Sequence, residues 1–158
     1  FLFIGTGNPE LQSITDLAAE FGVDALVREI PERMPFLQVQ QMLRESNGAL
    51  VIGSTEPHYS ASKIFQCLVT APRLFGFFHE KSEGVQILRK CSATNFFVGY
   101  NTQKSDGQLI TELAQKIEQF SNEESPWNPQ LQRLEAHSAR TNAATFAAAV
   151  ESLLPQKS

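Results

Sequence analysis

Short runs of consecutive apolar residues alternate along the chain with longer stretches in which apolar residues recur every three or four positions. A continuous apolar run is typical of a buried strand, and the spaced pattern is typical of a helix with one apolar face. The runs predict five strands, at Phe1–Ile4, Ala25–Ile30, Ala49–Gly53, Arg73–Phe78 and Thr94–Val98.

Helices are expected between these strands and after the last of them. The first should begin at Pro9 with Asn8 as its N-cap and end at Gly22, since proline favours the first helical turn and glycine ends helices. The other helices are expected after Pro35, from Ser60 or Ser62, after Ser82, from about Gly107 to Phe120 behind a cap at Ser105 or Asp106, and from about Leu131 or His137 to Leu154.

The regular alternation of strands and helices predicts an α/β fold. Buried strands joined by right-handed helical crossovers form a mostly parallel sheet with helices on both faces, which is a Rossmann-like three-layer α/β/α domain. A length of 158 residues is ordinary for one domain, and 42% hydrophobic residues are enough to build a core. We therefore expect residues 1–158 to form a single Rossmann-like domain.

Composition narrows the class of protein. The net charge is −4 and there is no basic run, so nucleic acid is not an expected partner. Two cysteines, Cys67 and Cys91, are too few for a disulfide framework and are expected to be reduced and buried. Most of the 12 phenylalanines are expected in the core. No apolar stretch approaches the roughly 20 residues that span a bilayer, so no transmembrane segment is expected.

The start of the chain suggests its origin. It opens with Phe1 inside an apolar run and without methionine, so we interpret it as a fragment of a longer protein. No secretory leader is visible, because the apolar start lacks a basic segment and a small-residue cleavage site. We expect a cytoplasmic location, with peripheral attachment at the inner face of the membrane as a further expectation for the full-length protein.

Four loops are candidates for ligand binding, because ligands of such sheets bind at the carboxyl ends of the strands. They are Gly5–Asn8, Ile30–Arg33, Ser54–Lys63 and His79–Ser82. The first begins like a dinucleotide fingerprint, but Glu10 fills its third small position. The turn can bring a ligand close to the backbone, and the alternative is a plain strand-to-helix turn.

The segment Ser60–Lys63 carries a stronger signal. It follows a buried strand and opens a helix, so it combines free backbone N–H groups, two hydroxyls and a lysine, which together suit a phosphate. The alternative is simple capping of the helix by Ser60 or Ser62, with Lys63 in solvent. The nearby His58, His79, Glu56 and Glu80 match no metal-ligand spacing, so we expect no metal.

The loops in succession resemble the C-terminal, donor-binding domain of GT-B glycosyltransferases, close to the family 4 enzymes. The resemblance covers about the whole chain. It rests on Phe1–Gly7, Ile30–Arg33, Ala49–Ser54, Glu56–Gln66, Pro72 with the strand after it, and His79–Ser82.

The resemblance implies a role for each loop in binding a nucleotide-sugar donor. Arg33 would flank the base, and Ser62 and Lys63 would face the diphosphate. Gln66 stands where the family often has a glutamate that binds the ribose. The donor set implied for the remaining loops is Gly5, Gly7 and Asn8 in the first turn, Glu56 near the first family carboxylate, and Glu80 and Ser82 near the sugar.

The function expected from the resemblance is donor binding in a glycosyltransferase that moves a sugar from a nucleotide diphosphate sugar to an acceptor. The donor is a substrate, and no cofactor is expected. The family needs an N-terminal GT-B domain for the acceptor, so that domain is the expected partner and this chain alone should be inactive. The alternative is a non-catalytic α/β ligand-binding or interaction domain, whereas the incomplete glycine fingerprint argues against a nicotinamide-binding domain. The sugar, base and acceptor stay open.

Overall fold

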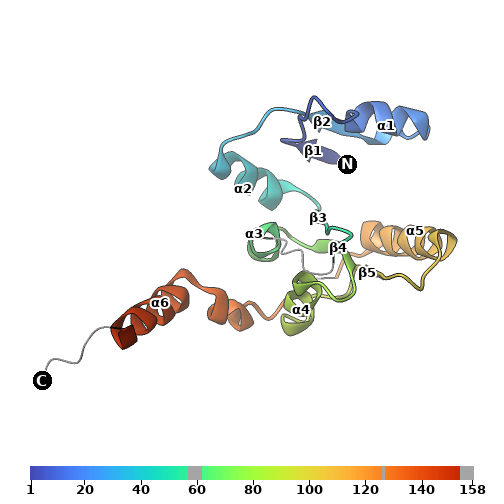
Figure 1. Ribbon diagram of the computed structural model, residues 1–158. Coiled ribbons are helices and arrows are strands. Elements are labelled where there is room, and N and C mark those ends of the chain that lie inside the picture. Colours follow the sequence, from blue (N-terminus) through green and yellow to red (C-terminus); the bar gives the residue numbers. More distant parts are fainter. Residues whose placement is uncertain (57–61, 126, 154–158) are drawn as a thin grey trace, which may run out of the picture. The chain divides into compact units, whose positions relative to one another are not determined.

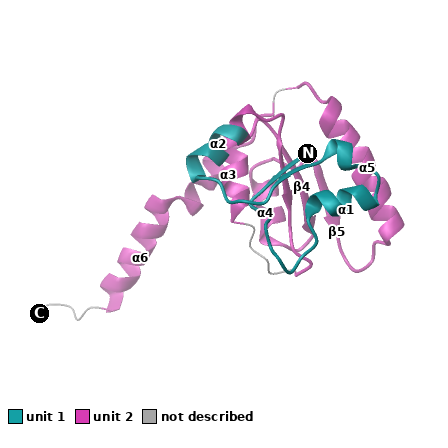
Figure 2. Cartoon of the chain, turned by 90° about the horizontal axis from the view of Figure 1, so that it is seen from above, with its two compact units in different colours: residues 1–42 teal, residues 43–158 magenta. Residues whose placement is uncertain are grey.

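The structure is a computed structural model that describes residues 1–56, 62–125 and 127–153. The chain divides into two compact units, unit 1 at Phe1–Met42 and unit 2 at Leu43–Ser158 (Figure 2). Each unit has its own parallel sheet, so the five predicted strands belong to two sheets.

Unit 1 is built on two parallel strands, β1 (Leu2–Ile4) and β2 (Arg28–Ile30). Helix α1 (Ile14–Glu20) and a short 3-10 helix (Asp24–Leu26) connect them (Figure 1). Helix α2 (Phe36–Glu45) follows and crosses the division between the units.

The start of α1 corrects the sequence prediction. The helix begins at Ile14, because the Ser13 hydroxyl accepts a hydrogen bond from the Asp16 N–H at 3.0 Å and caps it there. Asn8 does not cap a helix. Its side-chain oxygen accepts from the Glu10 N–H at 3.1 Å, which satisfies that donor in a local turn. The predicted end was right, since Gly22 follows the helix with φ +67°.

Two strand boundaries also differ from the prediction. Residues 25 and 26 belong to the 3-10 helix, so β2 starts only at Arg28. The fifth strand, β5, covers Phe97–Tyr100 and lies further along the chain than predicted. In both cases a turn precedes the strand, and the apolar residues within it extended the apparent run in the sequence.

Unit 2 contains a three-stranded parallel sheet in the order β3-β4-β5, with β3 at Ala49–Ile52 and β4 at Leu74–His79. The predicted strand ranges are close to these. The helices of this unit are α3 (Lys63–Thr70), α4 (Glu83–Lys90), α5 (Asp106–Asn122) and α6 (Ala139–Leu153), with a 3-10 segment at Leu131–His137 before the last (Figure 1).

Strand β4 separates two layers of side chains. Leu74 and Phe78 are buried in a cluster with the apolar faces of α3 and α4. Phe75 is buried in a second cluster, which α5 covers. Alternate residues of a strand face opposite sides of the sheet, so helices pack on both faces. The predicted α/β, Rossmann-like three-layer arrangement is thus confirmed and is complete within unit 2.

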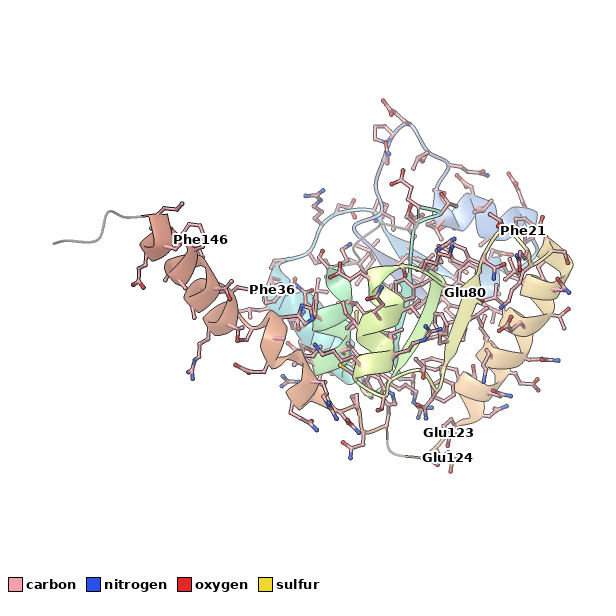
Figure 3. The ribbon with its side chains drawn as sticks, turned by 60° about the horizontal axis from the view of Figure 1, so that its bottom comes forward. Phe21, Phe36, Glu80, Glu123, Glu124 and Phe146 are labelled. Atoms are coloured by element: carbon pink, nitrogen blue, oxygen red, sulfur yellow. The ribbon has the colours of Figure 1, made fainter. Side chains whose placement is uncertain are left out.

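The buried residues confirm one expectation and correct another. Cys67 and Cys91 are both free and buried, and burial raises the pKa of each thiol. The phenylalanines are less uniformly internal than predicted. Phe21, Phe36 and Phe146 are 75%, 59% and 73% exposed (Figure 3). Phe21 directly follows α1, and the helices that carry Phe36 and Phe146, α2 and α6, have no buried residue.

Candidate functional site

The carboxyl ends of the three strands of unit 2 are held together by polar and aromatic contacts. The Tyr100 hydroxyl, at the end of β5, donates to the Ser54 carbonyl at 2.5 Å, just beyond β3. His79 ends β4 opposite Tyr100, and the two rings meet edge to face with centroids 5.8 Å apart. The edge at which ligands of parallel sheets bind is therefore an ordered surface in this unit.

Glu80, which directly follows β4 (Figure 3), is the centre of a charged network at this edge. The Asn101 amide donates to its carboxylate at 2.8 Å, and the Lys104 ammonium lies 3.5 Å away. Lys104 also contacts Glu112 at 2.8 Å and donates to the Gly99 carbonyl at 2.6 Å. The network ties the ends of β4 and β5 to the first turns of α5.

The network holds both partners in their charged forms. The hydrogen bond from Asn101 lowers the pKa of Glu80, and the charge of Lys104 acts in the same direction. The hydrogen bond with Glu112 raises the pKa of Lys104. Lys104 partly offsets the charge of Glu80, so this carboxylate repels an anionic ligand at this edge less than an unpaired acid would.

Replacing Glu80 by glutamine is expected to reduce the amount by which the free energy of unfolding falls between neutral and acidic pH. The folded-state pKa of Glu80 is lowered, so its carboxylate stabilises the fold above its unfolded pKa, and that contribution is lost as pH falls through the folded pKa. Urea denaturation at about pH 7 and about pH 3.5 should show a smaller difference for Glu80→Gln than for the parent. Glu118→Gln, at an exposed position of α5, is the matched control. Equal pH dependence in Glu80→Gln and the parent would contradict the prediction.

Two buried polar residues lie close to Glu80 in the chain: His79, the last residue of β4, and Ser82, just before α4. The His79 Nδ1 atom accepts from the Lys81 N–H at 3.3 Å, and the Ser82 N–H donates to the His79 carbonyl at 2.9 Å. Ser82 occupies the predicted N-cap of α4 and is 2% exposed. Its hydroxyl makes no side-chain capping bond and has no partner among the described residues.

The start of α3 is arranged as the sequence predicted, from Ser62 onward. Ser62 is the N-cap and Lys63 the first helical residue, and both are exposed. The Ser62 hydroxyl makes no capping bond, so the capping alternative does not describe it. Lys63 takes no part in the two salt bridges found among the described residues. Ser60 and His58 lie outside the described residues.

Two other candidates of unit 2 lie on the surface near these elements. Gln66 is exposed on the first turn of α3. Glu56 is exposed beyond β3, and its N–H donates to the Ser54 hydroxyl at 3.2 Å.

In unit 1 the glycine turn and the loop after β2 come together. Gly5 has φ +72° and donates to the Ile30 carbonyl at 2.9 Å. Gly7 donates to the Pro31 carbonyl at 3.0 Å, and a Cβ on Gly7 would lie 2.9 Å from that oxygen. Both glycines are therefore required by the backbone itself. Arg33 is exposed next to this turn, with its Cγ 3.7 Å from the position of a Cβ on Gly5.

The predicted site residues thus fall into two groups. Unit 1 holds Gly5, Gly7, Asn8 and Arg33, and unit 2 holds Glu56, Ser62, Lys63, Gln66, Glu80 and Ser82.

Sequence reasoning missed Glu29, Tyr100, Asn101, Lys104 and Glu112, which make most of the polar contacts. Tyr100 and Asn101 could have been found by the rule used for the other loops, had the fifth strand been extended to its true end. Glu29 lies inside a strand, where no loop signal marks it.

Comparison with protein-family models, curated proteins and solved structures finds no match to the chain. Within the described residues, no three histidine, cysteine or acidic side chains gather where they could hold a metal ion. No helix of the described part is long and apolar enough to cross a membrane.

Proposed function

We propose that the chain binds a nucleotide diphosphate sugar, as the donor-binding domain of a glycosyltransferase, and that the start of α3 receives the diphosphate. The observation that carries the proposal is the pairing of an uncapped Ser62 hydroxyl with an exposed Lys63 at a helix N-terminus. First-turn N–H groups have no partner within a helix and point outward, so they suit phosphate oxygens. Lys63 would add a compact positive charge.

The chemistry of sugar transfer explains why such a site is useful. Negative charge develops on the diphosphate as the bond to the sugar breaks, and fixed N–H donors with a cation stabilise that charge. The diphosphate leaves with the bonding electrons, and an acceptor oxygen takes the sugar. In this proposal the acceptor and its base belong to an N-terminal domain of the parent protein, and the isolated chain binds the donor without turnover.

A second candidate function is binding or interaction without catalysis. Two observations favour it. Gln66 carries no charge at the position where the resembling family often binds ribose with a glutamate. Glu80, at the end of β4, is already engaged by Asn101 and Lys104, so a ligand would have to compete with those contacts.

Titration calorimetry with UDP-, GDP- and ADP-glucose separates the two functions. Lys63→Ala is expected to weaken binding of whichever donor binds by about tenfold or more, since hydrogen bonds to charged groups are worth about 1.5–3 kcal/mol. Ser62→Ala should cost less. Lys90→Ala is the matched control, because Lys90 lies at the C-terminal end of another helix, α4, and this variant should bind like the parent.

Two results would contradict the proposal. Equal affinity of Lys63→Ala and the parent would remove the diphosphate from this helix. No binding of any of the three donors would leave the non-catalytic function as the better account.

A further inference from the structure

We propose that unit 1 holds a second ligand site, a cleft beside Glu29 that takes an uncharged polyhydroxy ring such as a single sugar. This site is separate from the diphosphate site proposed in unit 2 and does not depend on it. It lies where the glycine turn after β1 meets the end of β2 and the start of α1. The cleft has a volume of about 270 Å³, and its lining includes Thr6, Gly7, Asn8, Ser13 and Glu29.

The Glu29 carboxylate is fixed by contacts from two elements. The Thr6 hydroxyl donates to one of its oxygens at 2.5 Å. The N–H of Thr15, in the first turn of α1, donates to the other at 3.2 Å, and the Thr15 hydroxyl lies 3.4 Å from the same oxygen. The hydrogen bond from Thr6 lowers the pKa of Glu29, so the group is a charged acceptor at neutral pH. The Ile14 N–H also donates to this carboxylate, which therefore has about the four hydrogen bonds it can accept, and a ligand hydroxyl would displace the long contact from the Thr15 hydroxyl.

The other polar groups of the cleft provide both donors and acceptors. Asn8 uses its oxygen on the Glu10 N–H, which leaves its amide N–H groups available among the described contacts. Ser13 accepts from Asp16 and keeps its own O–H to donate. Thr6 donates to Glu29 and keeps its oxygen lone pairs. Sugar hydroxyls both donate and accept, so they match this mixture.

Charge and size narrow the ligand further. None of the described residues that line the cleft is a lysine or an arginine, and the charged group among them is Glu29. A phosphate would therefore meet an acidic oxygen without a cation in the lining, which disfavours a diphosphate in this cleft. The volume lies just below the roughly 300–1,000 Å³ of pockets that take drug-sized ligands, which is enough for one sugar ring.

The test is an NMR titration of the chain with D-glucose, D-galactose, D-ribose and inorganic phosphate. At least one sugar is expected to shift the backbone amides of Thr6, Gly7 and Thr15 in a saturable way, and phosphate is expected to leave them unchanged. The proposal would be overturned if phosphate shifted these amides. It would also be overturned if none of the three sugars shifted them.

Variants link the response to the residues of the cleft. Glu29→Gln should weaken binding of the responding sugar by about tenfold or more, because a charged acceptor is lost. Glu10→Gln, an exposed acid in the same loop, is the matched control and should change nothing. Because Glu29→Gln also loosens the start of α1, Asn8→Asp serves as a second variant. It keeps the oxygen that accepts from Glu10 but loses both amide donors, and it should also bind more weakly.

Lys63→Ala distinguishes this site from the proposed donor site. It should leave the sugar response of unit 1 intact even where it abolishes nucleotide binding. Parent-like sugar binding by both Glu29→Gln and Asn8→Asp would place the sugar elsewhere.

Discussion

Phe78→Ala is expected to lower the free energy of unfolding of unit 2 by about 3–5 kcal/mol. Phe78 is fully buried in the cluster formed with α3 and α4. Three glycines surround its ring. A Cβ on Gly53, Gly84 or Gly76 would lie 2.7, 2.9 or 3.0 Å from an atom of that ring. Glycines have no side chains that could fill the space, so the cavity would persist and the cost should lie at the upper end of the range.

Urea denaturation followed through the fluorescence of Trp127, which packs against the same cluster, provides the measurement. Phe146→Ala removes an identical side chain that is 73% exposed on α6 and is the matched control. A loss of less than about 1 kcal/mol for Phe78→Ala, or equal losses for both variants, would show that this cluster does not carry the stability of unit 2.

Gly48→Ala is expected to cost about 1–3 kcal/mol through overpacking. The added Cβ would lie 2.4 Å from the Phe120 ring, 2.8 Å from Arg73 Cγ and 3.1 Å from the Arg73 carbonyl oxygen. The Arg73 carbonyl is held in place, because it accepts from the Ala49 N–H at 2.9 Å. The Phe120 ring is packed edge to face against Phe75 and Phe96, with centroids 5.7 and 5.1 Å away. A shift of any of these groups therefore disturbs the second cluster or the β3–β4 pairing.

Gly107→Ala is the matched control for this substitution. Gly107 lies in the first turn of α5, and a Cβ there would meet nothing within 4 Å. Alanine favours a helix over glycine by about 0.8–1.0 kcal/mol, so this variant should be slightly more stable than the parent. If the contacts of Gly48 decide the outcome, thermal or urea unfolding should show that Gly48→Ala is less stable than the parent and Gly107→Ala is more stable. A stabilised Gly48→Ala would contradict the prediction.

Much of the fold was predictable because its signals are local. Ala49–Ile52 and most of β4 are continuous apolar runs, and both form strands of the three-stranded sheet. β4 is buried almost throughout, whereas Leu50 and Ile52 of β3 are exposed. Ser105 begins α5 through a reciprocal capping box with Gln108, a pattern four residues long. The start of α3 at Ser62 was equally visible. The start of α1 was not, because Asn8 and Ser13 are both good caps and the competing turn at Asn8 depends on the geometry of its neighbours.

The candidate sites show the limit of that reasoning. The sequence indicated which loops follow the strands, and so it identified Ser62, Lys63, Glu80 and Ser82 as polar residues at or near one edge of a sheet. It could not indicate which of them already have partners. Ser82 is buried and its hydroxyl has no partner in the described part of the chain, whereas Glu80 is bound by Asn101 and Lys104.

By itself, the amino-acid sequence determined the α/β class and the approximate strands and helices, because these follow from periodicities of two to four residues. It also determined the burial of both cysteines, because a free cysteine behaves as a small hydrophobic residue. The tertiary structure alone decided the division into two units and the pairings that shape the sites. Thr6 meets Glu29 across 23 positions, and Tyr100 meets Ser54 across 46. Such contacts depend on the register of paired strands, which the pattern of a single strand does not specify.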